Sequence, residues 1–308
     1  MRAGYAVMSE GKKVRHCYPI QEWTDTAPNY VGKNDTYHSL HHHGVAVESE
    51  LMAYRIYFDK KQTIDPYCKR HPQLELAQSY WYPNDSLLAV GYGDDILRVS
   101  GTVGVGSVKY WNGKLRHIEP VAERSQRIVQ SKKDQATIEV AVKGWEIPKS
   151  QISNLKSQIV DLTVRYTMLA GHRDMRCDVE VSEPVEGLCT GVQTIPAKGG
   201  KDTTTIILPN GVLLASWGTD WPVNDSAKYA KETVGLAVFI PKEYAGQLVH
   251  DKQNSLCLFC TKAEHKKDTS YTAHFYLTCC GATKEDHPVA KSATEWLAYL
   301  RKWASKLK

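Results

Sequence analysis

The sequence lacks several features that would assign it to a common functional class. No apolar run approaches the ~18 residues of a membrane-spanning helix, and residues 1–17 contain no apolar run long enough for a signal peptide. We therefore expect a cytoplasmic protein, or a periplasmic or extracellular one if a leader precedes this chain. The sequence also contains no P-loop, no zincin motif and no serine-protease-like elbow, so these three enzyme classes are not predicted.

The chain also has little excess charge of either sign. The formal net charge is only +5, and the basic residues are dispersed or clustered at the C-terminal end, at Lys302, Lys306 and Lys308. No nucleic-acid-binding motif accompanies them, so we predict no nucleic-acid partner. A weak positive field would still favour an acidic substrate such as a uronic-acid sugar.

The cysteines form no motif larger than a single pair. Cys257 and Cys260 have the spacing of metal and redox motifs, but they lie in an apolar run typical of a strand, and no second pair has zinc-ribbon spacing. Buried free thiols are the favoured interpretation. No nucleophilic cysteine is predicted, because none lies in an electropositive motif.

Phenylalanine is rare, whereas the other aromatic residues are abundant: 4 Phe stand against 17 Tyr and 8 Trp. Tyr and Trp rings combine an apolar face with a polar tip, which suits stacking on sugar rings. The alternative is that they occupy half-buried positions in β-sheets, which they also favour.

Short runs of β-branched and aromatic residues, separated by Asp, Asn, Gly and Pro, recur along most of the chain. Hairpins are predicted around Asn112-Gly113, between 158–169 and 175–181, and at 209–211. The glycine-rich run 101–106 has no helix after it, so turns or bulges are the better interpretation than a nucleotide-binding loop.

Only residues 292–307 have helical spacing, with a capping-box pattern of Ser292 and Glu295 at the start. We therefore predict an all-β protein with an amphipathic helix, at 291–308, that docks on the sheets. Residues 1–37 are expected to be irregular or to form edge strands, and the whole chain 1–308 is expected to be one domain.

The densest group of ionisable residues lies in the segment 38–69. Because strand residues alternate between the two faces of a sheet, one face is expected to carry His41, His43, Val45 and Val47. The other face would then carry His42, Gly44, Ala46 and Glu48. In the next strand, Tyr54, Ile56 and Phe58 alternate with Arg55, Tyr57 and Asp59. One face can thus be core and the other a polar floor.

Several motifs follow this region: His42-His43-Gly44, 48–51 (ESEL), 53–65 (AYRIYFDKKQTID), 74–76 (LEL), 82–83 (YP), 91–95 (GYGDD) and 104–106 (GVG). Together they resemble the DUF4861 family of Bacteroidota, from about Thr36 to the terminal helix. The resemblance implies a galactose-mutarotase-like supersandwich of large antiparallel sheets packed face to face.

The same resemblance implies carbohydrate processing, because such proteins occur beside, or fused to, enzymes that hydrolyse unsaturated uronyl residues from pectin-type polysaccharides. The expected ligand is therefore an oligosaccharide or polysaccharide. We expect this chain to act alone or with a uronyl hydrolase as its partner.

The segment 38–69 supplies the groups for acid–base chemistry on a uronic-acid-containing or pectin-type saccharide, in a lyase or hydrolase reaction. The predicted catalytic residues are His42, His43, Arg55, Asp65 and Lys69. Arg55 would hold the substrate carboxylate by a two-pronged contact, and a histidine would transfer a proton near neutral pH. Lys69 or Tyr67 would serve as the complementary acid.

Substrate contacts are expected from the same segment and from two later ones. The predicted substrate-binding residues are Glu48, Glu50, Tyr67, Tyr82, Asp94, Trp217, Asp220 and Trp221. Asp94 and Asp95 are adjacent in a strand and point to opposite faces, so at most one faces the site. The polar segment 218–232 is expected to form a loop over the site.

Other interpretations of these residues stay open. Arg55 and Glu50 could form a structural ion pair, and the histidines could be exposed in a turn. His41 and His43 have a spacing that suits zinc, but no third ligand can be identified, so no metal ion or cofactor is predicted. One alternative function is a non-catalytic carbohydrate-binding module or a partner subunit of a uronyl hydrolase. The other is a mutarotase-like sugar epimerase, which needs a histidine pair and a glutamate across one pocket.

Overall fold

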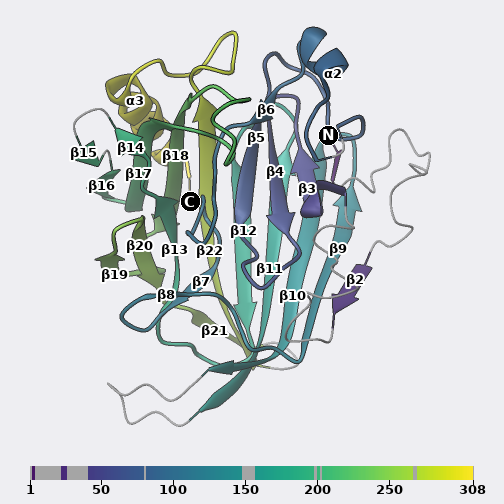
Figure 1. Cartoon of the computed structure of the whole chain (residues 1–308). Helices are drawn as coiled ribbons and strands as arrows, with labels where there is room; N and C mark the ends of the chain where they lie inside the picture. The colour runs from purple at the N-terminus through teal and green to yellow at the C-terminus, as the bar shows by residue number, and fades with distance from the viewer. Residues whose placement is uncertain are drawn as a thin grey trace.

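The structure is a computed structural model of the chain (Figure 1). It describes residues 2–3, 22–25, 41–79, 81–147, 157–197, 200–201, 203–265 and 269–307. Most of the predicted edge region 1–37 lies outside the described residues. Its two described pieces, β1 (Arg2–Ala3) and β2 (Glu22–Asp25), are edge strands of two different sheets.

A ten-stranded antiparallel sheet is the largest part of the fold, with the strand order β16-β17-β18-β22-β12-β11-β10-β9-β2 and with β21 paired to β22. Its other strands are β9 (Glu123–Ser131), β10 (Gln135–Ile147), β11 (Gln158–Leu169), β12 (Met175–Val181), β16 (Thr203–Leu208), β17 (Gly211–Asp220), β18 (Glu232–Pro241), β21 (Lys262–His265) and β22 (Thr269–Gly281). The predicted hairpins β11–β12 and β16–β17 are confirmed.

Two five-stranded sheets pack on one face of the ten-stranded sheet, so that β3–β6 lie alongside β9–β12 in Figure 1. One has the order β1-β3-β4-β5-β6, with β3 (Gly44–Glu48), β4 (Met52–Tyr57), β5 (Ile64–Cys68) and β6 (Asp94–Asp95). The other has the order β19-β20-β13-β7-β8, with β7 (Lys109–Trp111), β8 (Leu115–Arg116), β13 (Leu188–Gln193), β19 (Ala245–His250) and β20 (Asn254–Phe259). A short pair, β14 (Pro196–Ala197) and β15 (Gly200–Lys201), lies apart from both.

One hydrophobic core joins the three large sheets. Val45 and Val47 of β3 pack into the same cluster as Val140 of β10 and Leu188 of β13. Burial of apolar surface is the main stabilising term in such a fold, at about 25 cal/mol per Å². The predicted all-β architecture of large antiparallel sheets is therefore confirmed.

The C-terminal helix α3 (Ala293–Ala304) covers the opposite face of the ten-stranded sheet. Because strand residues alternate, Leu213 of β17 packs against the helix residues Trp296 and Leu300, whereas Leu214 faces the main core. The Ser292 hydroxyl accepts a hydrogen bond from the backbone N–H of Glu295 at 3.2 Å, as the capping pattern predicts. No helix in the described ranges is long and apolar enough to cross a membrane.

The three histidines before β3 are not part of the strand, so the expected alternation through 41–43 is wrong. They form a short 3₁₀ turn, and His42 and His43 have φ values of 56° and 60°. Gly44 follows with φ +150°, and a Cβ there would lie 2.2 Å from the carbonyl oxygen of Ile56. From Val45 onward the alternation holds.

The glycine-rich run 101–106 bridges the two five-stranded sheets. Isolated bridges pair Gly104 with Ile64 and Val105 with Val192. Gly104 has φ +58°, and a Cβ there would lie 2.5 Å from the carbonyl oxygen of Ile64, so only glycine fits. The run therefore fixes the distance between the two sheets.

The short helix α2 (Asp85–Ala89) was not predicted.

Candidate functional site

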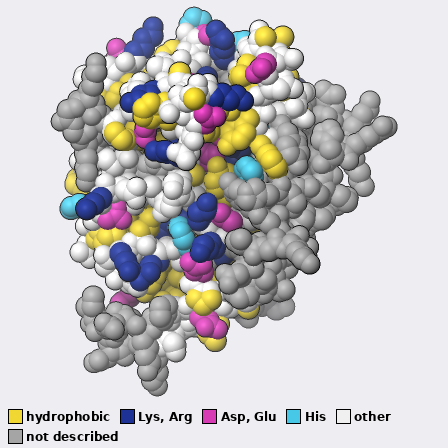
Figure 2. Space-filling view, in the orientation of Figure 1, with side chains coloured by type: hydrophobic (Ala, Val, Ile, Leu, Met, Phe, Trp, Pro, Cys, Tyr) yellow, Lys and Arg dark blue, Asp and Glu magenta, His cyan; other side chains and the backbone are white. Residues whose placement is uncertain are grey.

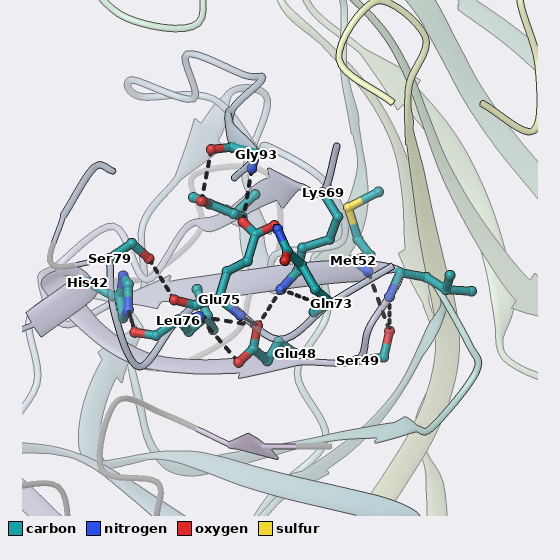
Figure 3. A network of polar contacts seen from close by, with 12 residues as sticks. His42, Glu48, Ser49, Met52, Lys69, Gln73, Glu75, Leu76, Ser79 and Gly93 are labelled. Atoms are coloured by element: carbon teal, nitrogen blue, oxygen red, sulfur yellow. Dashed lines mark hydrogen bonds and ion pairs between the residues drawn. The ribbon is translucent and has the colours of Figure 1, made fainter. Parts of the chain in front are cut away.

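The polar face of β3, β4 and β5 is covered by the chain segment that follows β5. Leu76 from this segment packs on Ala46, Ala53 and Tyr67, and all four side chains are buried. Figure 3 shows the segment held to the strands by polar contacts. The polar floor predicted from the sequence exists, but most of it is closed to solvent.

A buried ion pair holds this segment in place. Lys69 donates to Glu48, whose carboxylate also accepts the backbone N–H groups of Glu75 at 2.8 Å and Leu76 at 3.2 Å. The Glu75 carboxylate, whose pKa is raised by burial, accepts the backbone N–H of Gly93 at 3.0 Å. These five residues are called the Glu48 network below. Charges that are this fully paired have a structural role, and the predicted residues Glu48 and Lys69 belong to it.

Three more of the predicted site residues lie in or beside the Glu48 network. His42 is completely buried, and its Nε2 donates to the carbonyl oxygen of Leu76 at 2.8 Å. The Tyr67 hydroxyl donates to the carbonyl oxygen of Gly93 at 2.9 Å. Glu50 is half-buried, and its backbone carbonyl accepts the N–H of Gln73 at 3.0 Å. None of these three residues lines the cavity described next.

A cavity of about 820 Å³ opens where the two five-stranded sheets meet loops of the ten-stranded sheet. Its walls come from the end of β4, the segment after β6, the end of β13, the end of β17 and the turn before β20. They include Tyr57, Lys61, Tyr82, Asp95, Arg98, Gln193, Asp220, Asn224 and Lys252. On the face drawn in Figure 2, acidic and basic side chains are interspersed.

A buried cluster of charged side chains lies behind the cavity wall and reaches it at Asp95. The Nη2 of Arg55 contacts the Asp65 carboxylate at 2.5 Å and also the Asp95 carboxylate, and Nη1 donates to the carbonyl oxygen of Trp81 at 2.7 Å. The Tyr57 hydroxyl donates to the same Asp65 oxygen at 2.5 Å. Tyr57 and Asp95 line the cavity, and Arg55 and Asp65 lie behind them.

Arg55 does not present a free guanidinium to a ligand. Its side chain is 1% exposed and contacts two carboxylates and a carbonyl. Burial by itself would lower the pKa of Arg55, but Asp65, Tyr57 and Tyr82 together outweigh burial and raise it, so the guanidinium stays charged. The partners of Arg55 in the structure are thus Asp65 and Asp95, whereas the sequence analysis expected a substrate carboxylate or, as the alternative, Glu50.

His43 lies one ring behind the cavity wall. Its ring stacks on Trp81 at a centroid distance of 5.0 Å and meets Tyr57 edge-on at 5.8 Å. His43 is therefore placed to support Tyr57, and Tyr57, which was not predicted as a site residue, is the one of the two that lines the cavity. The period-2 alternation that puts Tyr57 on the same face as Arg55 was the available signal.

The two aspartates of β6 differ as expected, but the roles are exchanged. Both are buried, but Asp95 lines the cavity, whereas Asp94, the predicted ligand-binding residue, does not. Burial raises the pKa of the Asp94 carboxyl to about 6. Tyr82 lines the cavity as predicted, with its ring centroid 5.8 Å from the Arg55 guanidinium carbon.

The predicted loop 218–232 is shorter in the structure, because β17 ends at Asp220 and β18 begins at Glu232. Asp220 and residues 222–224 line the cavity. Trp221 lies under Lys231, whose Nζ is 4.1 Å from the ring centroid. Trp217 packs against Trp296 of α3 at 6.5 Å, on the sheet face away from the cavity. Trp217 is therefore part of the helix interface and not placed to stack on a ligand in this cavity.

The structure also bears on the predictions made for metal ligands and for the cysteine thiols. Within the described residues, no three or more His, Cys, Asp or Glu side chains are grouped to hold a metal ion. The described cysteines are all free, and each of them except Cys260 is buried. Burial raises the pKa of the Cys257 thiol to about 11, which keeps it protonated and unreactive at neutral pH.

The structure is an all-β sandwich with a polar cavity at the junction of its sheets. The chain belongs to the DUF4861 family, a domain of unknown function whose profile matches residues 5–308. No match was found among the curated proteins.

Two solved structures with similar folds are α-galactosidases. The galactosidase domain of the α-galactosidase-sucrose kinase AgaSK has a TM-score of 0.32 at 10% identity, covering 78% of this chain and 41% of that one. The GH36 α-galactosidase AgaB from Geobacillus stearothermophilus has a TM-score of 0.31 at 8% identity, covering 78% and 40%. The chain spans about two fifths of the length of these proteins. Structural similarity at this level does not indicate an activity for this chain.

Proposed function

We propose that the protein binds a short oligosaccharide in the cavity and acts on it by acid–base chemistry. The observation that carries the proposal is Tyr57, which lines the cavity and whose hydroxyl donates to the buried carboxylate of Asp65. The cavity volume of about 820 Å³ falls within the range of about 300–1,000 Å³ typical of ligand pockets. Tyrosine rings, amides and carboxylates along one wall suit a ligand rich in hydroxyl groups.

Tyr57 and Asp65 form a proton relay in this proposal. The Tyr57 hydroxyl donates to Asp65 Oδ2, so Oδ2 is the oxygen that takes the proton, and Oδ1 is buried with no hydrogen-bond partner among the described residues. As a base, Tyr57 takes a proton from the saccharide while passing its own to Asp65, and as an acid it reverses both transfers. Arg55 stabilises the carboxylate in either direction. Positioned groups of this kind contribute about 10²- to 10⁴-fold to a rate.

The proposed substrates are uronic-acid-containing or pectin-type saccharides, and the proposed reaction is a lyase or hydrolase reaction. Support comes from the three cations that line the cavity, Lys61, Arg98 and Lys252. A uronyl hydrolase partner and a periplasmic or extracellular location remain proposals, which co-purification and cell fractionation would test.

The test compares two tyrosines on the same strand. Tyr57→Phe removes the hydroxyl at the cavity, and Tyr54→Phe removes a buried hydroxyl that donates to the carbonyl oxygen of Arg173 on the opposite face of β4. We expect Tyr57→Phe to lower turnover of acidic oligosaccharides by about 10²-fold or more, and Tyr54→Phe to leave turnover within about threefold of the wild type. Equal turnover in both variants would remove Tyr57 from the mechanism.

A non-catalytic carbohydrate-binding module is the second candidate. This candidate is favoured because His42 and Lys69, two of the predicted proton-transfer residues, lie in or beside the Glu48 network and not at the cavity. Few groups that could transfer a proton therefore line the cavity. Calorimetry combined with product analysis discriminates, because a module binds saccharide without forming product. An epimerase is not favoured, since the described residues that line the cavity include no histidine and no glutamate.

A further inference from the structure

We propose that Arg98 is the residue that recognises a carboxylate on the bound saccharide, and that Asp220 occupies Arg98 until the saccharide replaces it. This inference rests on the proposed saccharide function of the cavity. It assigns the anion-binding role to a residue outside the segment 38–69.

The contacts of Arg98 are loose enough to be exchanged. Its Nη2 lies 3.6 Å from Asp220 Oδ2, beyond hydrogen-bond range, and its Nη1 donates to Asn224 Oδ1 at 3.2 Å. The Arg98 and Asp220 side chains are 43% and 28% exposed. Exposed ion pairs of this kind contribute little to stability, so a ligand can displace Asp220 at little cost.

The backbone of Arg98, in contrast, is held firmly. Its carbonyl oxygen accepts a hydrogen bond from Gln193 Nε2 at 3.1 Å, and Gln193 Oε1 accepts one from the Thr102 hydroxyl at 2.7 Å. Gln193 is itself buried at the end of β13. A fixed main chain with an exchangeable guanidinium is the arrangement that a recognition residue needs.

Arg98 and Lys252 are the lining cations that an anionic ligand can approach without breaking a close ion pair. Lys61 lies 3.2 Å from the Asp59 carboxylate, whereas Arg98 is only loosely paired with Asp220. The planar guanidinium fork matches a carboxylate with two parallel hydrogen bonds. Once displaced, Asp220 is free to accept hydrogen bonds from sugar hydroxyls.

The experiment measures binding of two trisaccharides by calorimetry: trigalacturonate, and the same sugar with its carboxyl groups reduced to alcohols. The variants are Arg98→Gln and Asp220→Asn. The matched control is Arg176→Gln. Arg176 is 45% exposed and lies 2.7 Å from Asp178, so it resembles Arg98 as an exposed, paired arginine. It lies on β12 and does not line the cavity.

We expect Arg98→Gln to weaken trigalacturonate binding about 10- to 100-fold and to leave the reduced sugar unaffected. Asp220→Asn is expected to bind trigalacturonate as tightly as the wild type or more tightly, because Arg98 loses its competing partner. Arg176→Gln is expected to match the wild type with both sugars.

Each contrary result has its own meaning. Equal affinity of the wild type and Arg98→Gln for trigalacturonate overturns the inference alone, as does a loss of affinity in Asp220→Asn as large as that in Arg98→Gln. A wild type that binds both sugars equally well also overturns the inference and keeps the saccharide function. A wild type that binds neither sugar overturns the proposed function and the inference with it.

Discussion

Replacing Lys69 with methionine tests whether the Glu48 network is structural. The substitution keeps a long side chain but leaves Glu48, which is 0% exposed, as a buried carboxylate without its counter-ion. Removing one partner of a buried ion pair costs about 3–5 kcal/mol. Because Glu48 keeps the N–H groups of Glu75 and Leu76, we expect the lower end, about 3 kcal/mol.

This cost translates into a measurable shift in Tm. An unfolding entropy of about 2.1 cal/mol/K per residue, over 308 residues, gives about 0.65 kcal/mol/K. Lys69→Met should therefore lower Tm by about 5 °C, measured by circular dichroism. The control Lys60→Met changes an exposed lysine 3.9 Å from Glu119, and we expect a shift below about 2 °C.

The double variant Glu48→Gln with Lys69→Met sharpens the test. The double variant leaves no uncompensated charge. We therefore expect its loss of unfolding free energy to be smaller than the sum of the losses in the two single variants. An unchanged Tm for Lys69→Met, combined with loss of turnover, would refute this reasoning and return Lys69 to the catalytic residues.

Three further perturbations test separate parts of the account. The pKa of Asp94 is about 6 in the folded protein against an ordinary 3.8, so the folded state binds more protons between these values and loses stability as pH rises through them. In denaturant titrations, Asp94→Asn should therefore be more stable than the wild type by about 2–3 kcal/mol at pH 7 and equal to it below about pH 3. A difference independent of pH would contradict the assignment. Trp217→Ala removes the ring that packs on Trp296 of α3, so it should lower the free energy of unfolding by about 2 kcal/mol and leave saccharide affinity unchanged. Lost affinity with unchanged stability would place Trp217 at the ligand. Gly104→Ala should cost about 2 kcal/mol or more, because of its positive φ and the Ile64 carbonyl oxygen, and a neutral effect on the denaturation midpoint would be inconsistent with the bridge between the sheets.

Local sequence patterns predict the elements of this fold well. The alternation after Gly44 places Val45 and Val47 in the core and Glu48 on the other face, as observed. Helical spacing and the Ser292 cap define α3. The pattern fails at His42 and His43, because their left-handed backbone is imposed by the neighbouring chain and not by residue type.

The site was only partly predictable, since alternation tells which face a residue occupies but not what covers that face. Nothing local in the segment around Glu75 indicates that it folds over β3–β5 and closes the polar floor. The cavity combines Tyr57, Arg98, Gln193 and Lys252 from distant parts of the chain. Only tertiary packing brings these side chains together, so their sequence positions carry no shared signal.

The most direct test of the central claim is where a saccharide protects the backbone from hydrogen exchange. With trigalacturonate bound, we predict slower amide exchange in 95–102, 193–196 and 220–224, the segments that line the cavity. Protection confined to 69–79, with the cavity segments unchanged, would contradict the account and place the ligand at the Glu48 network.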